Sequence, residues 1–211
     1  MRDQYWGSEE EEKKQEPISI HEALKERQNA SSDDFNTVNV IDNKIYFYSG
    51  VSRPKVLKLN QSIVSLNRNF AKSQVMGYST PPIKVHINSY GGSVFAGLAA
   101  VDYIKSSKAN VETIIDGCAA SAATMMSVVA NHRSMHRNSC MLIHQLSGMM
   151  WGKFAEMKDD MQNSEMLMNK IKNIYREHTK IPEDVLEDIL KHDIWWEAEK
   201  CLEYGLVDEI I

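Results

Sequence analysis

The chain has 211 residues, 43% of them hydrophobic, and a formal net charge of −5, which suits one domain with a sizeable core. Residues 1–34 carry ten acidic and five basic side chains, whereas the rest of the chain carries 19 of each sign. We expect no nucleic-acid partner, because the neutral body offers no basic surface, and no membrane partner, because no apolar run reaches spanning length. Three cysteines without paired spacing, Cys118, Cys140 and Cys201, favour a reducing compartment and a cytoplasmic location.

The first 37 residues differ from the rest in composition. They are polar and acidic, most strongly from Glu9 to Lys14, and they lack the apolar stretch of a signal peptide. We therefore divide the chain into an N-terminal segment, residues 1–37, and a body, residues 38–211. The segment is interpreted as disordered chain, as a propeptide that is removed, or as an axial gating segment, and the sequence leaves these alternatives open.

The sequence of the body predicts an α/β fold, because short apolar runs alternate with longer stretches in which apolar residues recur at helical spacing. We expect strands at residues 38–41, 44–48, 83–87, 111–115, 141–144 and 206–211. We expect helices at residues 56–70, 94–106, 119–130, 154–178, 183–192 and 197–204, and a loop at 72–82. Strands that alternate with helices at this spacing predict right-handed crossovers and a mainly parallel sheet with covered faces.

One serine, Ser121, lies among small residues where an expected strand turns into a helix, in the motif GCAASAA at residues 117–123. A serine at such a turn is exposed, and the positive end of the helix favours a developing negative charge. Two further motifs follow or end expected strands: INSYGGS at residues 87–93 and MLIHQ at residues 141–145. Sites of open α/β sheets form at the carboxyl ends of strands, so the three motifs are expected to meet in one crevice.

These residue types suit acyl transfer. Ser121 is the candidate nucleophile and His144 the candidate base, because an imidazole can take the hydroxyl proton near neutral pH. The backbone N–H groups of Gly92 and Ala122 are candidates for the oxyanion hole. A carboxylate must also orient the imidazole. Chemistry alone leaves these carboxylates as equal candidates: Asp116, Asp159, Asp160, Asp193 and Asp208.

Each of these residues also has a structural interpretation. A serine in a small-residue turn and a histidine at a strand end are most often parts of the scaffold. His192, directly before Asp193, is a rival base, whereas His86 is interpreted as a rim group of its strand. Cys118 is interpreted as a small buried filler, because Ser121 holds the better position for a nucleophile.

Four segments together resemble the proteolytic subunit of the Clp protease, the ClpP family. The fourth is DIWWEAEKCLEYGLVD at residues 193–208, and the likeness covers roughly residues 38–211. Matched by motif, the resemblance implies that Ser121 is the nucleophile, His144 the base and Asp193 the orienting acid. It also implies that Gly92 and Ala122 supply the oxyanion amides. The assignment of Asp193 as the orienting acid rests on this resemblance. Its structural alternative is a role as the N-cap of the helix that follows.

The resemblance implies a fold and an assembly as well. It implies a crotonase-like fold of repeated ββα units with a mainly parallel sheet and a long handle helix. It implies a serine endopeptidase without metal or organic cofactor, built as heptameric rings stacked into a tetradecamer with the active sites inside. Polypeptide substrates would bind as an added strand beside Gly91 and Gly92. A separate ATP-dependent unfoldase would be the partner.

Three features depart from the family pattern. Tyr90 replaces the usual proline before the glycine pair, and Ala122 replaces the usual methionine, which leaves the backbone N–H intact. The segment LSGMMWG at residues 146–152 replaces a glycine-rich segment of the handle. The methionines there and along residues 154–178 are interpreted as core or subunit contacts. Two other functions remain open: a catalytically silent ring subunit, and a crotonase-fold enzyme that acts on acyl thioesters.

Overall fold

A computed structural model describes residues 37–211, in which one sheet is combined with six helices. The strands are β1 (Thr37–Ile41), β2 (Lys44–Tyr48), β3 (Ile83–Ser89), β4 (Val111–Ala120), β5 (His132–Met135), β6 (Cys140–Leu142), β7 (Trp195–Trp196) and β8 (Glu209–Ile210). The helices are α2 (Arg53–Val75), α3 (Val94–Lys105), α4 (Ala122–Val128), α5 (Phe154–His178), α6 (Glu183–Ile189) and α7 (Ala198–Glu203). The N-terminal segment falls almost wholly outside the described residues, so its interpretation stays untested.

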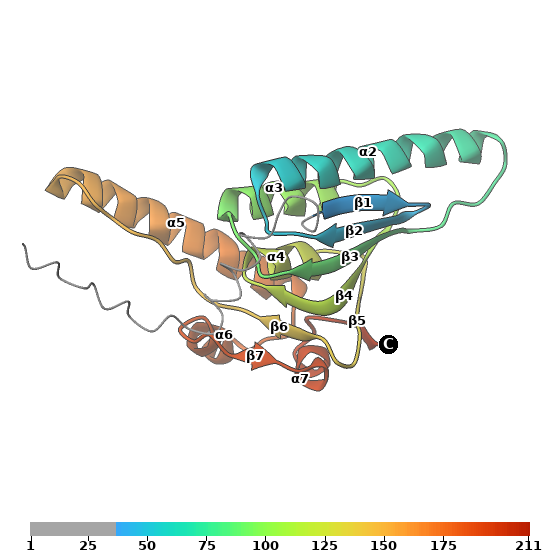
Figure 1. Cartoon of the computed structure of the whole chain (residues 1–211). Helices are drawn as coiled ribbons and strands as arrows, with labels where there is room; N and C mark the ends of the chain where they lie inside the picture. The colour runs from blue at the N-terminus through green and yellow to red at the C-terminus, as the bar shows by residue number, and fades with distance from the viewer. Residues whose placement is uncertain (1–36) are drawn as a thin grey trace, which may run out of the picture.

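The sheet is mainly parallel, as the alternation of elements predicts. Its strands follow the order β1-β2-β3-β4-β5-β8, with β6 beside β4 and β7 beside β6. Only the pairs β1–β2 and β6–β7 are antiparallel. Figure 1 shows α2 and α3 running beside the sheet, while α5 projects away from the body. The α/β class expected from the sequence, with a mainly parallel sheet and a long helix at Phe154–His178, is confirmed.

One face of the sheet builds the core. Along β3, Ile83, Val85 and Ile87 are fully buried, whereas the alternate residues Lys84 and His86 are half-buried on the opposite face. This period of two places every second side chain under the helices. The buried apolar side chains of α2, α3 and α4 join the same cluster. The open face therefore carries the polar side chains of the sheet.

Several expected boundaries are wrong. α2 begins at Arg53 and ends at Val75, so part of the expected loop at 72–82 is helical. β4 continues through Gly117 to Ala120, so α4 begins only at Ala122 and ends at Val128. Residues 132–135 form β5 instead of a connection, because they extend the sheet between β4 and β8. Tertiary pairing overrides the weak local signal in these short segments.

The C-terminal elements are shorter than expected. α6 ends at Ile189, α7 covers Ala198–Glu203, and the last strand is only Glu209–Ile210. β6 ends at Leu142, so His144 follows it by two residues. The short pair Trp195–Trp196 forms β7, which the sequence reading missed. The long helix at 154–178 is confirmed with its expected bounds.

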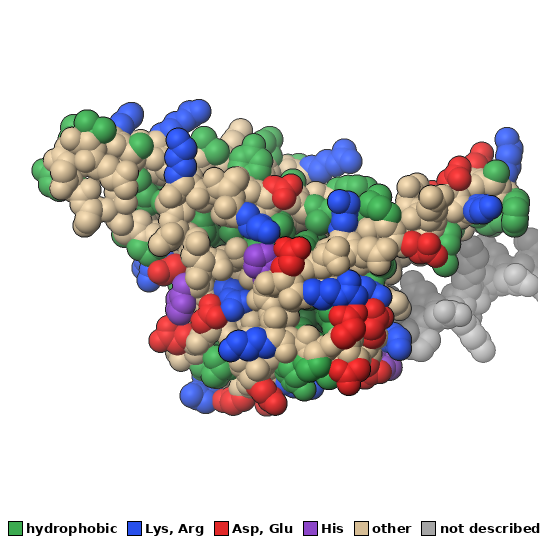
Figure 2. Space-filling model, turned by 180° about the vertical axis from the view of Figure 1, so that it is seen from behind, with side chains coloured by type: hydrophobic (Ala, Val, Ile, Leu, Met, Phe, Trp, Pro, Cys, Tyr) green, Lys and Arg blue, Asp and Glu red, His purple; other side chains and the backbone are tan. Residues whose placement is uncertain are grey.

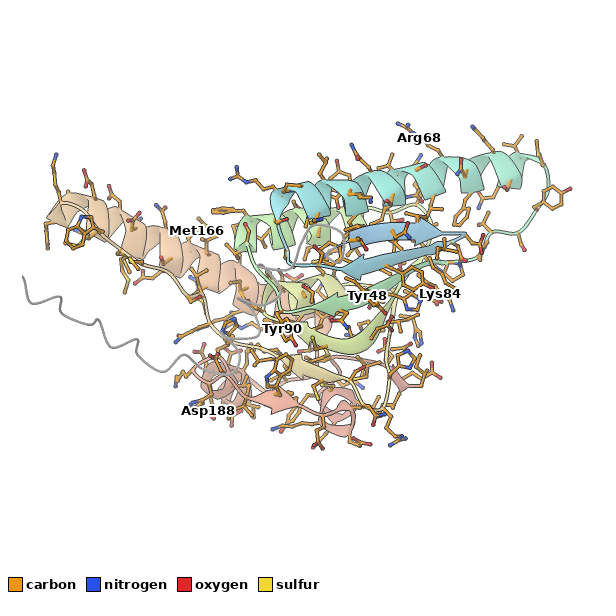
Figure 3. All side chains as sticks on the ribbon, viewed as in Figure 1. Tyr48, Arg68, Lys84, Tyr90, Met166 and Asp188 are labelled. Carbon is orange, nitrogen blue, oxygen red and sulfur yellow. The ribbon has the colours of Figure 1, made fainter. Side chains whose placement is uncertain are left out.

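The surface carries charges of both signs. Figure 2 shows acidic and basic side chains interspersed over the face seen from behind, in keeping with the neutral charge of the body. No helix among residues 37–211 is long and apolar enough to cross a membrane. Along α5 and the segment before it, large apolar side chains point to solvent, and Met166 is an example (Figure 3). The methionines there are thus mostly surface residues and not the core of this chain.

Candidate active site

Ser121 lies at the sharp turn between β4 and α4. Its φ of 54° and ψ of −125° are unusual for a residue with a side chain. The turn is held because the Ser121 N–H donates to the Leu142 carbonyl of β6 at 2.9 Å. The sequence prediction of a serine at a strand–helix turn is confirmed, and its strained backbone is the kind found at nucleophile turns.

His144 and Asp193 form a close pair. The Nδ1 atom of His144 lies 3.0 Å from Oδ1 of Asp193. The imidazole is nearly buried, with 10% of its side chain exposed, whereas Asp193 is about half exposed. A carboxylate on Nδ1 fixes the ring so that Nε2 is the nitrogen that can accept a proton.

The register of two short strands explains this pair. β6 and β7 run antiparallel with Leu142 opposite Trp195. Continuing that register by two residues in each direction brings His144 opposite Asp193. The N–H of Gln145 also donates to the Leu190 carbonyl at 2.7 Å, which ties the His144 segment to the end of α6. The antiparallel run of the two segments beyond β6 and β7 therefore brings Asp193 toward His144. Asp193 is not the N-cap of the helix that follows, since the N-cap of α7 is Glu197.

The glycine pair lies directly against the serine. A Cβ atom on Gly91 would lie 2.6 Å from the Ala120 carbonyl oxygen and 2.7 Å from Cβ of Ser121. Only glycine permits this approach, and its φ of 87° is a second reason for glycine there. Gly92 lies opposite Val51 in an isolated β-bridge, and the residues on either side of Gly92 make its hydrogen bonds. The Val51 N–H donates to the Gly91 carbonyl, and the Ser93 N–H donates to the Val51 carbonyl. The N–H of Gly92 takes no part in that bridge.

The second candidate amide belongs to the first residue of α4. Ala122 starts the helix, so its N–H has no acceptor in a preceding turn. Ala122 is nonetheless 3% exposed, because its side chain packs against α3. The free N–H groups at this end of the helix create a positive potential, which suits an oxyanion.

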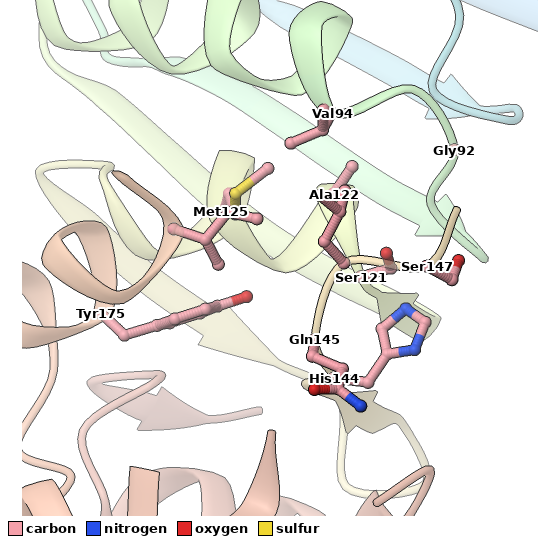
Figure 4. A pocket seen from close by; sticks show the side chains of 11 residues that line it. Gly92, Val94, Ser121, Ala122, Met125, His144, Gln145, Ser147 and Tyr175 are labelled. Carbon is pink, nitrogen blue, oxygen red and sulfur yellow. The ribbon is translucent and has the colours of Figure 1, made fainter. Parts of the chain in front are cut away.

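A pocket opens beside these groups. Its volume is about 430 Å³ including the open mouth, and its wall includes Gly92, Ser121, Ala122 and His144. The rest of the wall is largely apolar: Val94, Met125, Leu146, Ile171 and Tyr175, with Gln145 and Ser147. Figure 4 shows Ser121 and His144 on one side of this pocket and Tyr175 on the other. The site thus joins a reactive edge to a hollow whose remaining side chains are mostly apolar.

Tyr90 and Cys118 flank the site. The ring of Tyr90 meets that of Trp195 edge-on, with centroids 6.1 Å apart. Burial, together with the neighbouring Cys118, raises the pKa of Tyr90, and burial also raises the pKa of Cys118. A raised thiol pKa lowers the thiolate population, so Cys118 is a poor nucleophile. Cys118 is half-buried, less than the sequence interpretation of a buried filler implied.

The other candidate carboxylates are engaged elsewhere or lie in solvent. Asp116 binds His86, with Nδ1 and Oδ2 2.9 Å apart, and His86 lies on the strand face opposite the core, as its alternation predicts. Asp208 accepts from the guanidinium of Arg133, while Asp159 and Asp160 are exposed on α5. His192, the rival base, is 53% exposed and lies 3.8 Å from Asp188. No group of side chains in residues 37–211 has the arrangement of a metal site.

Comparison with known proteins shows the family to which the chain belongs. The family model described as Clp protease matches residues 42–211. The chain belongs to the Clp protease family. It is therefore a serine-type peptidase subunit of the Clp kind, as the resemblance of its motifs implied.

The relatives are distant in sequence, but their matches extend over most of the chain. The ATP-dependent Clp protease proteolytic subunit of Deinococcus radiodurans is 28% identical over 170 residues, which are 78% of this chain and 83% of that protein. Proteolytic subunit 1 of Chlamydia caviae is 35% identical over 136 residues, 62% of this chain and 70% of that protein. A mutant of ClpP1 from Listeria monocytogenes has a similar fold, with a TM-score of 0.70 at 24% identity, over 81% of this chain and 91% of that one.

Proposed function

We propose that Ser121, His144 and Asp193 form the catalytic triad of this Clp-type peptidase. The observation that carries the proposal is the 3.0 Å contact between His144 Nδ1 and Asp193 Oδ1. His144 also lines the pocket whose wall includes Ser121 and the two residues that carry the candidate amides, Gly92 and Ala122. Ser121, His144 and Asp193 thus fill the roles of nucleophile, base and orienting acid that acyl transfer needs.

The reaction follows from these positions. His144 takes the Ser121 hydroxyl proton on Nε2 while Oγ attacks the peptide carbonyl carbon. The carbonyl oxygen becomes an oxyanion that accepts from the N–H groups of Gly92 and Ala122. His144 then gives its proton to the leaving amine, and an acyl-enzyme remains. A water molecule repeats the sequence, releases the acid and restores Ser121.

The substrate is a polypeptide in extended form. We propose that its backbone pairs beside Gly91 and Gly92, where the close approach to Ser121 requires glycine. The side chain before the scissile bond would enter the pocket lined by Met125, Ile171 and Tyr175. Since that wall is largely apolar, we expect apolar side chains at this position to be preferred.

The assembly is proposed to be a heptameric ring, stacked in pairs into a tetradecamer. Along the handle, Met149, Trp151 and Phe154 are 94%, 92% and 81% exposed, respectively. So many exposed apolar side chains along one projecting element favour burial against other copies of the chain. We further propose a cytoplasmic location. We also propose an ATP-dependent unfoldase as partner, since the relatives are named as proteolytic subunits of an ATP-dependent protease.

Labelling with a fluorophosphonate probe tests the proposed nucleophile. We expect the assembled protein to be labelled, and peptide mapping by mass spectrometry to place the label on Ser121. A silent ring subunit or a thioester enzyme without a serine nucleophile would not react. Labelling at another serine, or none at all, would contradict the proposal.

Removal of residues 1–34 is expected to leave the assembly intact. These residues carry the whole net charge of −5, whereas the apolar contact residues lie in the body. Native mass measurement of a chain that begins near Asn36 should therefore give the same large species as the full chain. If the segment is a propeptide, the full chain should also shorten itself only when Ser121 is present. A monomeric truncated chain would instead make the segment part of the interface.

A further inference from the structure

β4 changes its partner shortly before the nucleophile. Its residues 112–115 pair with β5, and residues 118–120 pair with β6. On its other edge the register against β3 shifts, because Ile87 faces Ile115 but Ser89 faces Ala119. β4 therefore carries two extra residues in this interval, which form a bulge at residues 116–118. Gly117 has a φ of 86° there, a conformation that favours glycine.

Ser139 bonds to both sides of this bulge. Its hydroxyl donates to the Ile115 carbonyl at 2.9 Å and accepts from the Gly117 N–H at 2.8 Å. The side chain is 1% exposed, so water cannot readily take over either bond. The hydroxyl replaces backbone hydrogen bonds of the sheet that the bulge removes. It acts as a donor to one backbone group and as an acceptor from the other at the same time.

Asp116 holds the same bulge from the opposite direction. Its Oδ2 accepts from the Tyr48 hydroxyl of β2 at 2.6 Å and meets Nδ1 of His86 in β3 at 2.9 Å. Burial acts to raise the pKa of Asp116, but the hydrogen bonds from His86 and Tyr48 outweigh it and lower the pKa. The bulge is thus fastened to β2 and β3 through Asp116 and to the start of β6 through Ser139.

β6 connects the bulge to the reacting groups. Ser139 directly precedes β6, and its own N–H donates to the His136 carbonyl at 2.9 Å, which closes the turn between β5 and β6. The carbonyl of Leu142 in β6 accepts the Ser121 N–H. His144 follows β6 by two residues. A slip of β6 against β4 would therefore move Ser121 and His144 relative to each other.

We propose that Ser139 is a positioning residue for the Ser121–His144 pair. Its hydroxyl pins the β4 bulge to the start of β6, and it thereby sets the register that brings the nucleophile to the base. The inference rests on the proposed function of Ser121 and adds a residue outside the pocket wall. Ser139 touches no substrate, so its loss should slow the chemical steps and leave substrate binding nearly unchanged.

The test compares Ser139→Ala with a matched variant. Ser127 is also a buried serine, with 1% exposure, and its hydroxyl donates to the Thr124 carbonyl inside α4. We expect Ser139→Ala to lower kcat for a short peptide and the rate of fluorophosphonate labelling by roughly 10- to 100-fold, as small misplacements of reacting groups do. KM should change by less than about threefold. Ser127→Ala should lower thermal stability but leave the labelling rate within about twofold.

Ser139→Cys covers the case in which the alanine variant does not assemble. The thiol fills the space but is a weak donor and acceptor, so the assembled variant should label more slowly than the unmodified protein. Labelling of Ser139→Ala or Ser139→Cys at the unmodified rate would overturn the inference and leave the proposed function standing. An equal loss of rate in Ser127→Ala would overturn it as well. Absence of labelling in the unmodified protein would overturn the proposed function, and the inference with it.

Discussion

Ser121→Ala is expected to abolish fluorophosphonate labelling and to lower peptide cleavage by about 10⁴-fold or more, because no other group can form the acyl-enzyme. The residual rate would come from the amides of Gly92 and Ala122 and from substrate binding alone. Alanine keeps the side chain small at a turn where the serine backbone is already strained, so the fold and the assembly should survive. Native mass measurement checks the assembly, and a fluorogenic peptide with an apolar residue before the cleaved bond checks the rate.

Ser147→Ala is the matched control for this prediction. Ser147 lines the same pocket and offers a hydroxyl of the same kind, but no turn or helix end surrounds it. We expect the control to keep the label and most of the activity. Undiminished labelling of Ser121→Ala, or loss of the label in Ser147→Ala, would move the nucleophile away from Ser121.

The second large effect concerns the base and its carboxylate. His144→Ala should lower kcat by about 10⁴-fold or more, because the triad acts as a unit. Asp193→Asn should keep the fold, since the side chain is half exposed, but lower kcat by about 10⁴-fold. An amide at this position favours the imidazole tautomer that carries its proton on the wrong nitrogen. Turnover of a short peptide at neutral pH measures both variants.

A second histidine–aspartate pair provides the controls. His192 and Asp188 lie close to Asp193 in the sequence, yet their contact is 3.8 Å and both side chains are exposed. His192→Ala and Asp188→Asn should therefore change kcat by less than about twofold, the range of ordinary surface substitutions. Full activity of Asp193→Asn, together with a large loss in Asp116→Asn or Asp208→Asn, would show that the orienting acid had been assigned to the wrong residue.

Much of the fold could be predicted from local patterns. The helix at Phe154–His178 and the first hairpin were predicted closely, because each has a long or repeated pattern and clear turn signals. The short strands β5 and β7 could not be predicted, since four and two residues carry too little periodicity. Their strand character comes from neighbours in the sheet.

Some residues of the site could likewise be predicted from the sequence, and others could not. Ser121, His144 and the glycine pair could be singled out because small residues, a histidine and glycines each follow expected strands. Asp193 could be chosen only through a family resemblance, because its place opposite His144 depends on the register of β6 and β7. Ser139 gave no signal, since a serine before a short strand is unremarkable until the β4 bulge is seen.

Local patterns were therefore sufficient to predict the class of chemistry and the order of the elements that carry it. Residue types, small-residue turns and apolar periodicity are local properties, so they can be recognised without knowledge of the tertiary contacts. Which carboxylate contacts His144 and which hydroxyl holds the bulge before Ser121 became clear only from the folded chain. Those choices follow from strand register, and register is set by pairing between segments far apart in the chain.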